Sequence, residues 1–309
     1  MSFLTDREIK CPANLLALAK SSEPPRVVIA RAGAALPMAA AKQAVAAGIM
    51  VPIFVGELEA IAAQAAILEW DIADFEQIAA SGEAEAAQKA AAICGAGDGD
   101  VLMKGHLHTD VFMKSVLTRS NGLRTENRLV HLFHMSAADG DAPLVLSDCA
   151  VNVAPDMATK QAILRYCVEM LQMVGVTRPK IAILSATESA IPTVPSSMEA
   201  AELATWAGAQ ELNADVSGPL ALDLILSAES TKIKGLEGNI VAGNANGVIV
   251  PDIVSGNVLF KSLVYLSGAC AAGIVMGAKV PVLLSSRADP PAARLASVAL
   301  AAIMAKSRN

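Results

Sequence analysis

Short apolar runs alternate with helix-forming segments along the N-terminal third of the chain. We expect strands at 26–30, 51–55, 67–75 and 101–105, and helices at 12–20, 37–47, 57–66, 82–94 and 109–117. A run that is apolar at every position, such as RVVIA at 26–30, is typical of a strand buried on both faces of a sheet. Strands that alternate with helices indicate βαβ units. The sequence therefore predicts an α/β protein with a mostly parallel sheet.

The alternation is interrupted once, and the interruption suggests a second domain. Two apolar runs, 128–136 and 144–148, are separated by the turn-forming stretch ADGDAP, which predicts an antiparallel hairpin. Helices at 155–174, 196–207 and 219–226 and strands at 180–186 and 211–216 then resume the pattern. The expected α/β domains are 1–127 with 276–309, including a last helix at 290–306, and 128–275.

Composition limits the classes of partner. The formal charge of −6 gives no support for a nucleic-acid partner, which would require a basic face. The span 262–278 is uncharged but shorter than the ~20 residues that a membrane helix needs. The N-terminus lacks the apolar core of a signal peptide. Five scattered cysteines without CxxC spacing favour reduced thiols. We expect a cytoplasmic protein without nucleic-acid or membrane partners.

The C-terminal part holds the clearest candidate site. An apolar run at 280–284 predicts a strand, and Ser285-Ser286-Arg287-Ala288-Asp289 follows it directly. Ligands of open α/β proteins bind where strands leave the sheet, and the planar guanidinium of Arg can hold two phosphate oxygens. Arg287 therefore indicates a cleft for a phosphorylated substrate. The alternatives are an ion pair with Asp289 or a surface arginine.

Two Gly/Asn-rich segments allow a binding and a structural interpretation. The backbone N–H groups of 243–247 (GNANG) could face an anion, or the segment could be an ordinary tight turn. Ser255 or Asn257 could cap a helix at 258–266, whose N-terminus would attract phosphate. The capping role alone would also explain these residues.

Other motifs carry little specific chemistry. His106 and His108 would share one face of a strand, but no third metal ligand follows at a suitable spacing. A histidine that lines a cleft or bonds to the backbone is the alternative. A GxGxxG fingerprint after a strand, a complete P-loop and a GxSxG elbow do not occur in the sequence.

Seven segments between about 100 and 295 together form a specific pattern. They are Met103-Lys104-Gly105 with Thr109 and Lys114, Gly122-Leu123-Arg124-Thr125, Gly218-Pro219-Leu220 with Asp223, Gly243-Asn244-Ala245-Asn246, Pro251-Asp252, Ser255-Gly256-Asn257 with Lys261, and Ser286-Arg287-Ala288-Asp289. In this combination and order the chain resembles the phosphate acetyltransferase/phosphate butyryltransferase family. The MKG and SRAD segments are more similar to the butyryltransferase branch.

The resemblance implies an acyltransferase that moves an acetyl or butyryl group between coenzyme A and inorganic phosphate. It also implies two α/β domains with an active-site cleft between them, an isocitrate-dehydrogenase-like architecture, and a homodimer. Coenzyme A would be a substrate, and no cofactor or metal would be needed.

The resemblance assigns roles to particular residues. Catalytic roles fall on Ser286, Arg287, Asp223 and Lys114, and substrate-binding roles on Thr109, Asn244, Gly256, Asn257 and Asp289. Two positions depart from the acetyltransferase pattern. Lys114 stands where those enzymes have a phosphate-binding Arg, and Ala293 stands where they have an Asp proposed as the base. Asp289 or Asp223 would then have to serve as base, or no protein base is used.

These departures leave two alternatives to the acyltransferase. One is a non-catalytic acyl-CoA-binding or regulatory protein. The other is a metal- and NAD-dependent decarboxylating dehydrogenase of the same fold, which would need a cluster of aspartates where the sequence has only dispersed ones.

Overall fold

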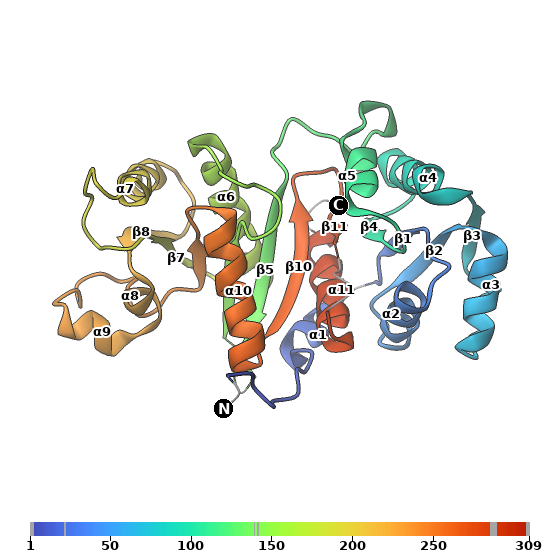
Figure 1. Ribbon diagram of the computed structural model, residues 1–309, viewed down its shortest axis with the longest axis horizontal. Helices are drawn as coiled ribbons and strands as arrows, with labels where there is room; N and C mark the ends of the chain where they lie inside the picture. Colours follow the sequence, from blue (N-terminus) through green and yellow to red (C-terminus); the bar gives the residue numbers. More distant parts are fainter. Residues whose placement is uncertain (1–2, 22, 139, 141, 285–288, 307–309) are drawn as a thin grey trace. The chain divides into compact units, whose positions relative to one another are not determined.

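The computed structural model describes residues 3–21, 23–138, 140, 142–284 and 289–306 of the chain (Figure 1). The chain divides into two compact units. One comprises Ile9–Leu129 with Ala272–Asn309 and is called the β1 unit below; the other comprises Met1–Glu8 with Val130–Ala271 and is called the β5 unit. Both consist of strands and helices, and the predicted α/β class with a mostly parallel sheet is confirmed.

The β1 unit contains a sheet whose strand order is β3-β2-β1-β4-β11-β10. The strands are β1 (Arg26–Ala30), β2 (Val51–Gly56), β3 (Glu76–Ala79), β4 (Val101–Lys104), β10 (Cys270–Met276) and β11 (Val282–Leu283). All pairs among the first four strands and β11 are parallel, and β10 pairs antiparallel with β11. Because parallel strands share one carboxyl edge, the residues that follow β1, β2, β3, β4 and β11 emerge on the same side of this sheet.

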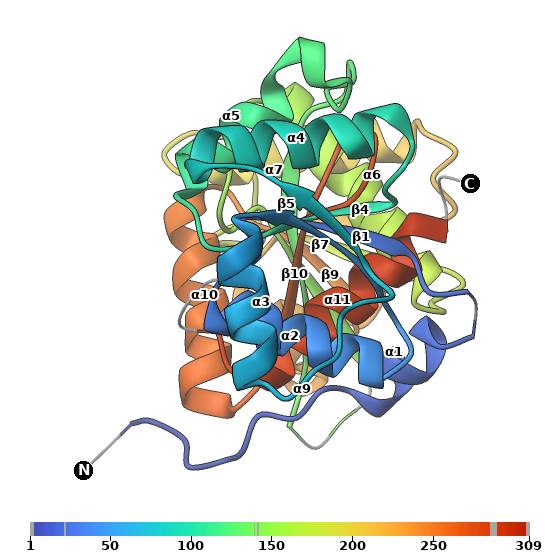
Figure 2. The same ribbon diagram turned by 90° about the vertical axis from the view of Figure 1, so that its right-hand side faces the viewer.

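Helices cover both faces of this sheet. They are α1 (Ala13–Ala19), α2 (Ala35–Ala46), α3 (Leu58–Ile67), α4 (Gly82–Ala96), α5 (Thr109–Leu117), the 3-10 helix η1 (Arg119–Asn121) and α11 (Pro291–Ala305). Figure 2 shows α4 and α5 on one face and α2, α3 and α11 on the other. The buried residues of α11 are mostly small or aliphatic, which lets the helix pack closely against strands and neighbouring helices.

The β5 unit has the strand order β5-β6-β9-β7-β8. The strands are β5 (Val130–Ser136), β6 (Pro143–Ser147), β7 (Lys180–Leu184), β8 (Asp215–Leu220) and β9 (Gly247–Ile249). The β5–β6 pair is antiparallel, which confirms the predicted hairpin, and the remaining pairs are parallel. Among the described elements, β8 is an edge strand, with β7 as its neighbour.

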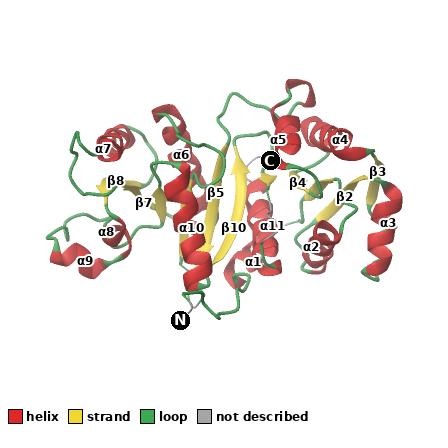
Figure 3. Ribbon diagram, in the orientation of Figure 1, coloured by secondary structure: helices red, strands yellow, loops and turns green. Residues whose placement is uncertain are grey.

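The helices of the β5 unit are α6 (Met157–Met173), α7 (Pro195–Gly208), α8 (Leu222–Leu226), α9 (Ala228–Ile233) and α10 (Ile253–Ser267). Figure 3 shows α6 and α7 on one side of β7 and β8, and α8 and α9 on the other. One core cluster joins β5, β6, β8 and β9 to α8, and Leu259, Phe260, Leu263 and Val264 of α10 pack against it. No helix among the described residues is both long enough and apolar enough to span a bilayer.

Some predicted elements were wrong for identifiable reasons. In place of the expected strand at 67–75, α3 ends at Ile67 and a region of turns and irregular backbone follows it. Its aromatic residues Trp70 and Phe75 pack on Phe54 of β2, with ring centroids 5.7 and 6.3 Å away. The apolar residues therefore cover the sheet without joining it, and the strand β3 begins only at Glu76.

Two further elements differ from the prediction: a helix that is shorter than expected and a strand that was not expected. Pro219 lies in β8 after a cis Gly218–Pro219 bond, so the helix expected at 219–226 is only the short α8. Strand β10 was not predicted. Gly268, with φ 71°, ends α10 in the left-handed conformation and separates the helix from the strand within one uncharged stretch.

Candidate functional site

The strongest predicted pair, Ser286 and Arg287, lies outside the described residues. The chain on either side is described. Leu283 of β11 pairs with Met103 of β4 in parallel register, so the chain leaves β11 at the edge where β4 ends. Beyond the gap, the backbone carbonyl of Asp289 accepts a hydrogen bond from the guanidinium of Arg294.

Two predicted residues lie on α5, the helix that follows β4. Thr109 is the first residue of α5 and Lys114 lies further along it, and both side chains are exposed. The N-cap is His108, and no side chain caps the helix. Gly105 makes the preceding turn possible, because an added Cβ would lie 2.4 Å from the carbonyl oxygen of Ala30.

Four charged or polar side chains form a network at the carboxyl ends of the parallel strands in the β1 unit. Arg31 follows β1, Glu57 follows β2, Glu83 lies in the first turn of α4 after β3, and His108 lies in the turn after β4. The Arg31 guanidinium lies 3.4 Å from Glu57 and 3.2 Å from Glu83. The Glu83 carboxylate in turn lies 2.8 Å from Nδ1 of His108. Sequence reasoning missed this network.

Backbone groups complete the network. The N–H of His108 donates to Glu83 at 2.9 Å, and the N–H of Gly82 donates to Glu57 at 3.0 Å. Arg31 itself has φ 56°, an unusual conformation for a side chain other than Gly, and its carbonyl accepts the N–H of His106 at 2.9 Å. The carboxylates of Glu83 and Glu57 therefore anchor the backbone of the segments that follow β4 and β3.

The same contacts keep both carboxylates ionised. The backbone N–H of His108, its ring and the Arg31 charge hold the pKa of Glu83 below its usual range. For Glu57 burial favours the protonated form, but hydrogen bonds from backbone N–H groups and the Arg31 charge outweigh it and lower the pKa. One guanidinium thus lies between two carboxylates.

The remaining predicted residues lie in the β5 unit. Asp223, in α8, has a half-exposed carboxylate 3.3 Å from the ammonium of Lys234. Lys234 also lies 3.8 Å from Glu188. Exposed ion pairs of this kind contribute little to stability.

The segment around Asn244 is a tight turn in the structure. The N–H groups of Gly243 and Asn244 donate to Leu224 and Val241, and the side chain of Asn244 donates to the carbonyl of Ala242 at 3.2 Å. Asn246 bonds to backbone groups of neighbouring strands. These bonds support the structural interpretation, and a substrate-binding role for Asn244 stays a prediction.

Gly256 and Asn257 lie inside α10, one turn past its start. Asp252 caps this helix by accepting the N–H of Ser255 at 2.9 Å, so the prediction that Ser255 or Asn257 caps a helix beginning at 258 was wrong. Gly256 is required by close packing, because a Cβ there would lie 2.7 Å from the carbonyl oxygen of Asp148. The amide of Asn257 donates to the carbonyl of Cys149 at 3.4 Å.

Asp148, at the carboxyl end of β6, is a second feature that the sequence did not reveal. Its carboxylate is buried and accepts the N–H groups of His131, Ala150 and Val151 at 2.9–3.0 Å and the amide of Asn152. The carboxylate thereby fixes the loop after β6, against which Gly256 packs.

The two histidines of β5 are buried and neutral. Burial lowers the pKa of His131 well below its usual range, partly opposed by the Asp148 charge. Burial lowers the pKa of His134 to about 4, partly opposed by a backbone hydrogen bond. Neither imidazole is therefore a cation near neutral pH. In the described part of the chain no group of three or more His, Cys, Asp or Glu side chains could hold a metal ion.

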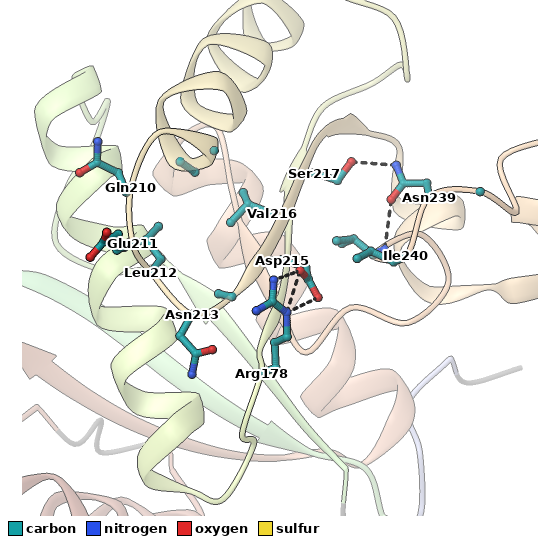
Figure 4. A pocket seen from close by; sticks show the side chains of 15 residues that line it. Arg178, Gln210, Glu211, Leu212, Asn213, Asp215, Val216, Ser217, Asn239 and Ile240 are labelled. Atoms are coloured by element: carbon teal, nitrogen blue, oxygen red, sulfur yellow. Dashed lines mark hydrogen bonds and ion pairs between the residues drawn. The ribbon is translucent and has the colours of Figure 1, made fainter.

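An open pocket of about 760 Å³ lies at the edge of the β5 unit, beside β8 (Figure 4). Among the residues that line it, Arg178 pairs with Asp215 at 2.6 Å, and Asn239 donates to Ser217 at 2.8 Å. None of the predicted site residues lines this pocket. Asp215 begins β8, so the pocket reaches the amino end of that strand, whereas ligands of parallel sheets bind at the carboxyl ends.

The fold and the family pattern agree with known proteins. The chain matches the family described as "Phosphate acetyl/butaryl transferase" over residues 75–302. It is 37% identical over 296 residues to a phosphate acetyltransferase of Rhizobium meliloti, covering 96% of this chain and 93% of that protein. It is 34% identical over 301 residues to a phosphate butyryltransferase of Clostridium acetobutylicum, covering 97% of this chain and 100% of that protein.

A solved structure supports the same grouping. The branched-chain phosphotransacylase from Enterococcus faecalis aligns with a TM-score of 0.79 and 31% identity, covering 91% of this chain and 99% of that one. The α/β class is therefore shared with phosphotransacylases. The chain belongs to the phosphate acetyltransferase/phosphate butyryltransferase family, as the sequence motifs predicted.

Proposed function

We propose that this protein transfers a short acyl group between coenzyme A and inorganic phosphate, forming an acyl phosphate and free coenzyme A. The observation that carries the proposal is family membership across most of the chain, with relatives that are named phosphate acetyltransferase and phosphate butyryltransferase. The acyl group would be acetyl or butyryl. Coenzyme A acts as a substrate, and the reaction needs no cofactor.

The mechanism is a direct displacement. Phosphate attacks the thioester carbonyl, a tetrahedral oxyanion forms, and coenzyme A leaves as a thiolate. Because phosphate is already anionic near neutral pH, the main tasks are to position two anions that repel each other and to stabilise the oxyanion.

The residues assigned by resemblance divide these tasks. Arg287 and Lys114 offset the charge repulsion, and Ser286 donates to the oxyanion. Asp223 keeps the catalytic role given above. Substrate-binding roles stay with Thr109, Asn244, Gly256, Asn257 and Asp289. The placement of Lys114 and Thr109 on an exposed helix after a parallel strand supports their access to an anion.

A thiol-release assay tests the function directly. The purified protein is incubated with acetyl-, propionyl-, butyryl- or isobutyryl-CoA, with and without phosphate, and free thiol is measured over time. We expect phosphate-dependent thiol release with at least one of these thioesters. Tight acyl-CoA binding without release would instead identify a non-catalytic acyl-CoA-binding protein, and inactivity with all four would refute the proposal.

We also propose that the protein is a homodimer, with helix α10 in the interface. One face of α10 packs on its own core, and Phe260 stacks on Phe133 with ring centroids 4.3 Å apart. The other face leaves Val254 67% and Val258 60% exposed, with Tyr265 and Leu266 half-exposed. Exposed apolar side chains that gather on one helix face mark an interaction surface, and a second copy would cover this face around the exposed Lys261.

Substituting Val258→Glu tests the interface. A carboxylate placed in the centre of an apolar interface is costly to desolvate, so we expect the variant to sediment as a monomer while the wild type sediments as a dimer. Leu58→Glu on α3, an apolar residue 42% exposed in the other unit, is the control and should remain dimeric. A wild-type monomer, or a dimeric Val258→Glu protein, would contradict the proposal.

The five free cysteines agree with the reduced, cytoplasmic location that we propose. The predicted domain bounds and the predicted active-site cleft stay predictions.

A further inference from the structure

The turn between β4 and α5 carries an imidazole whose two ring nitrogens have different surroundings. Nδ1 of His108 lies 2.8 and 3.0 Å from the two carboxylate oxygens of Glu83. An ionised carboxylate can only accept hydrogen bonds, so in the neutral imidazole the proton lies on Nδ1 and the lone pair on Nε2. Nε2 has no partner among the residues that the structure describes, and the side chain of His108 is 72% exposed.

Glu83 is held in place by groups other than the imidazole of His108. Its carboxylate accepts a hydrogen bond from Arg31 at 3.2 Å, and Arg31 is bound in turn by Glu57 and by the carbonyl of His106 at 3.3 Å. Glu83 also accepts the backbone N–H of His108 at 2.9 Å. The ring therefore has a fixed carboxylate partner and a fixed backbone anchor, the arrangement in which a carboxylate orients an imidazole as a base.

The imidazole lies at the carboxyl edge of the parallel strands. His108 is the residue before Thr109, and β4 is flanked by β1 and β11. The charged and titratable groups around it are Glu83 and, through it, Arg31 and Glu57, together with the neighbouring His106 and Asp110 of the first turn of α5. This edge is where ligands of such sheets bind.

Acyl exchange requires the movement of one proton. A monoprotonated phosphate dianion and an acyl-CoA yield an acyl phosphate dianion and a protonated thiol, so one proton passes from phosphate to sulfur. In the reverse direction the thiol must lose that proton before sulfur attacks, because the thiolate is the nucleophile. The C–S bond then forms, the C–O bond to phosphate breaks, and the departing phosphate recovers the proton.

We propose that Nε2 of His108 carries this proton and that Glu83 positions the ring. In acyl-CoA formation Nε2 accepts the thiol proton and returns it to the departing phosphate; in the opposite direction the two transfers are reversed. His108 is thus a catalytic residue and Glu83 a positioning residue. The proposal rests on the proposed function and adds to it the group that moves the proton.

The test is the pH dependence of acyl-CoA formation by His108→Gln, with kcat and KM for coenzyme A determined separately. We expect kcat to fall by about 10²-fold near pH 7, with little change in KM, because general-base catalysis commonly contributes this much. The defect should shrink as the pH rises and the thiol ionises unaided. A constant defect at every pH would indicate a structural role and overturn the proposal.

Two companion variants test whether Glu83 orients the His108 ring and whether the effect is specific to this histidine. Glu83→Gln keeps the shape but its amide can stabilise the wrong tautomer of the ring, so kcat should fall about 10-fold or more while the melting temperature is monitored. His106→Gln alters an exposed histidine two residues away and should leave kcat and its pH profile unchanged. Wild-type kcat in His108→Gln would refute this inference alone, whereas an inactive wild-type protein would refute the proposed function.

Discussion

Replacing Arg287 with Ala is expected to reduce phosphate-dependent turnover by about 10²–10³-fold, the usual effect of removing one group that stabilises negative charge in an active site. The guanidinium is the group that can hold two phosphate oxygens at once. The strand before it ends beside β4, at the edge from which Thr109 and Lys114 extend. Initial rates of thiol release over a range of phosphate concentrations measure the effect.

Two further substitutions sharpen this prediction. Arg287→Lys keeps the charge and loses the planar fork, so its turnover should fall between the wild type and Arg287→Ala. Arg119→Ala removes an exposed arginine of η1 in the same unit and should have wild-type rates. Full turnover in Arg287→Ala would remove this residue from the mechanism.

Replacing Asp148 with Ala is expected to destabilise the protein by about 3–5 kcal/mol, because several hydrogen bonds are lost together and each bond to a charged group contributes about 1.5–3 kcal/mol. The substitution leaves the buried N–H of His131 and the N–H groups of Ala150 and Val151 without their acceptor. A buried N–H group without a hydrogen-bond acceptor carries the full cost of desolvation. The melting temperature should fall on the order of 10 °C.

The matched control is Asp223→Ala, which removes a half-exposed carboxylate from an ion pair with Lys234. Its free energy of unfolding should change by less than about 1 kcal/mol. Equal melting temperatures for the Asp148 and Asp223 variants would show that the bonds at Asp148 do not stabilise the loop after β6.

Local patterns were sufficient to predict the fold class. Solid apolar runs identified β1, β2 and β4, and a turn between two such runs identified the β5–β6 hairpin. The pattern failed at 67–75, because apolar residues that cover a sheet resemble those that form one. It also failed at β10, because the helix and strand on either side of Gly268 share one uncharged composition.

The candidate site was only partly predictable, because its parts are distant in the sequence. Each of its four residues comes after a different strand: Arg31 after β1, Glu57 after β2, Glu83 after β3 and His108 after β4. Only the parallel strand order brings them to one edge of the sheet. The available signal was a charged or polar residue soon after the end of each strand: directly after β1 and β2, and in the turn or first helical turn that follows β3 and β4. Capping was misassigned to Ser255 or Asn257, since α10 begins earlier than expected and Asp252 occupies its N-cap position.

The most direct test of acyl exchange is the simultaneous measurement of both products from one acyl-CoA and phosphate. Free thiol is measured by its absorbance after reaction with a thiol reagent, and acyl phosphate is trapped with hydroxylamine. We predict one acyl phosphate for each thiol released, and no thiol without phosphate. Thiol release without acyl phosphate would show hydrolysis of the thioester and contradict the account.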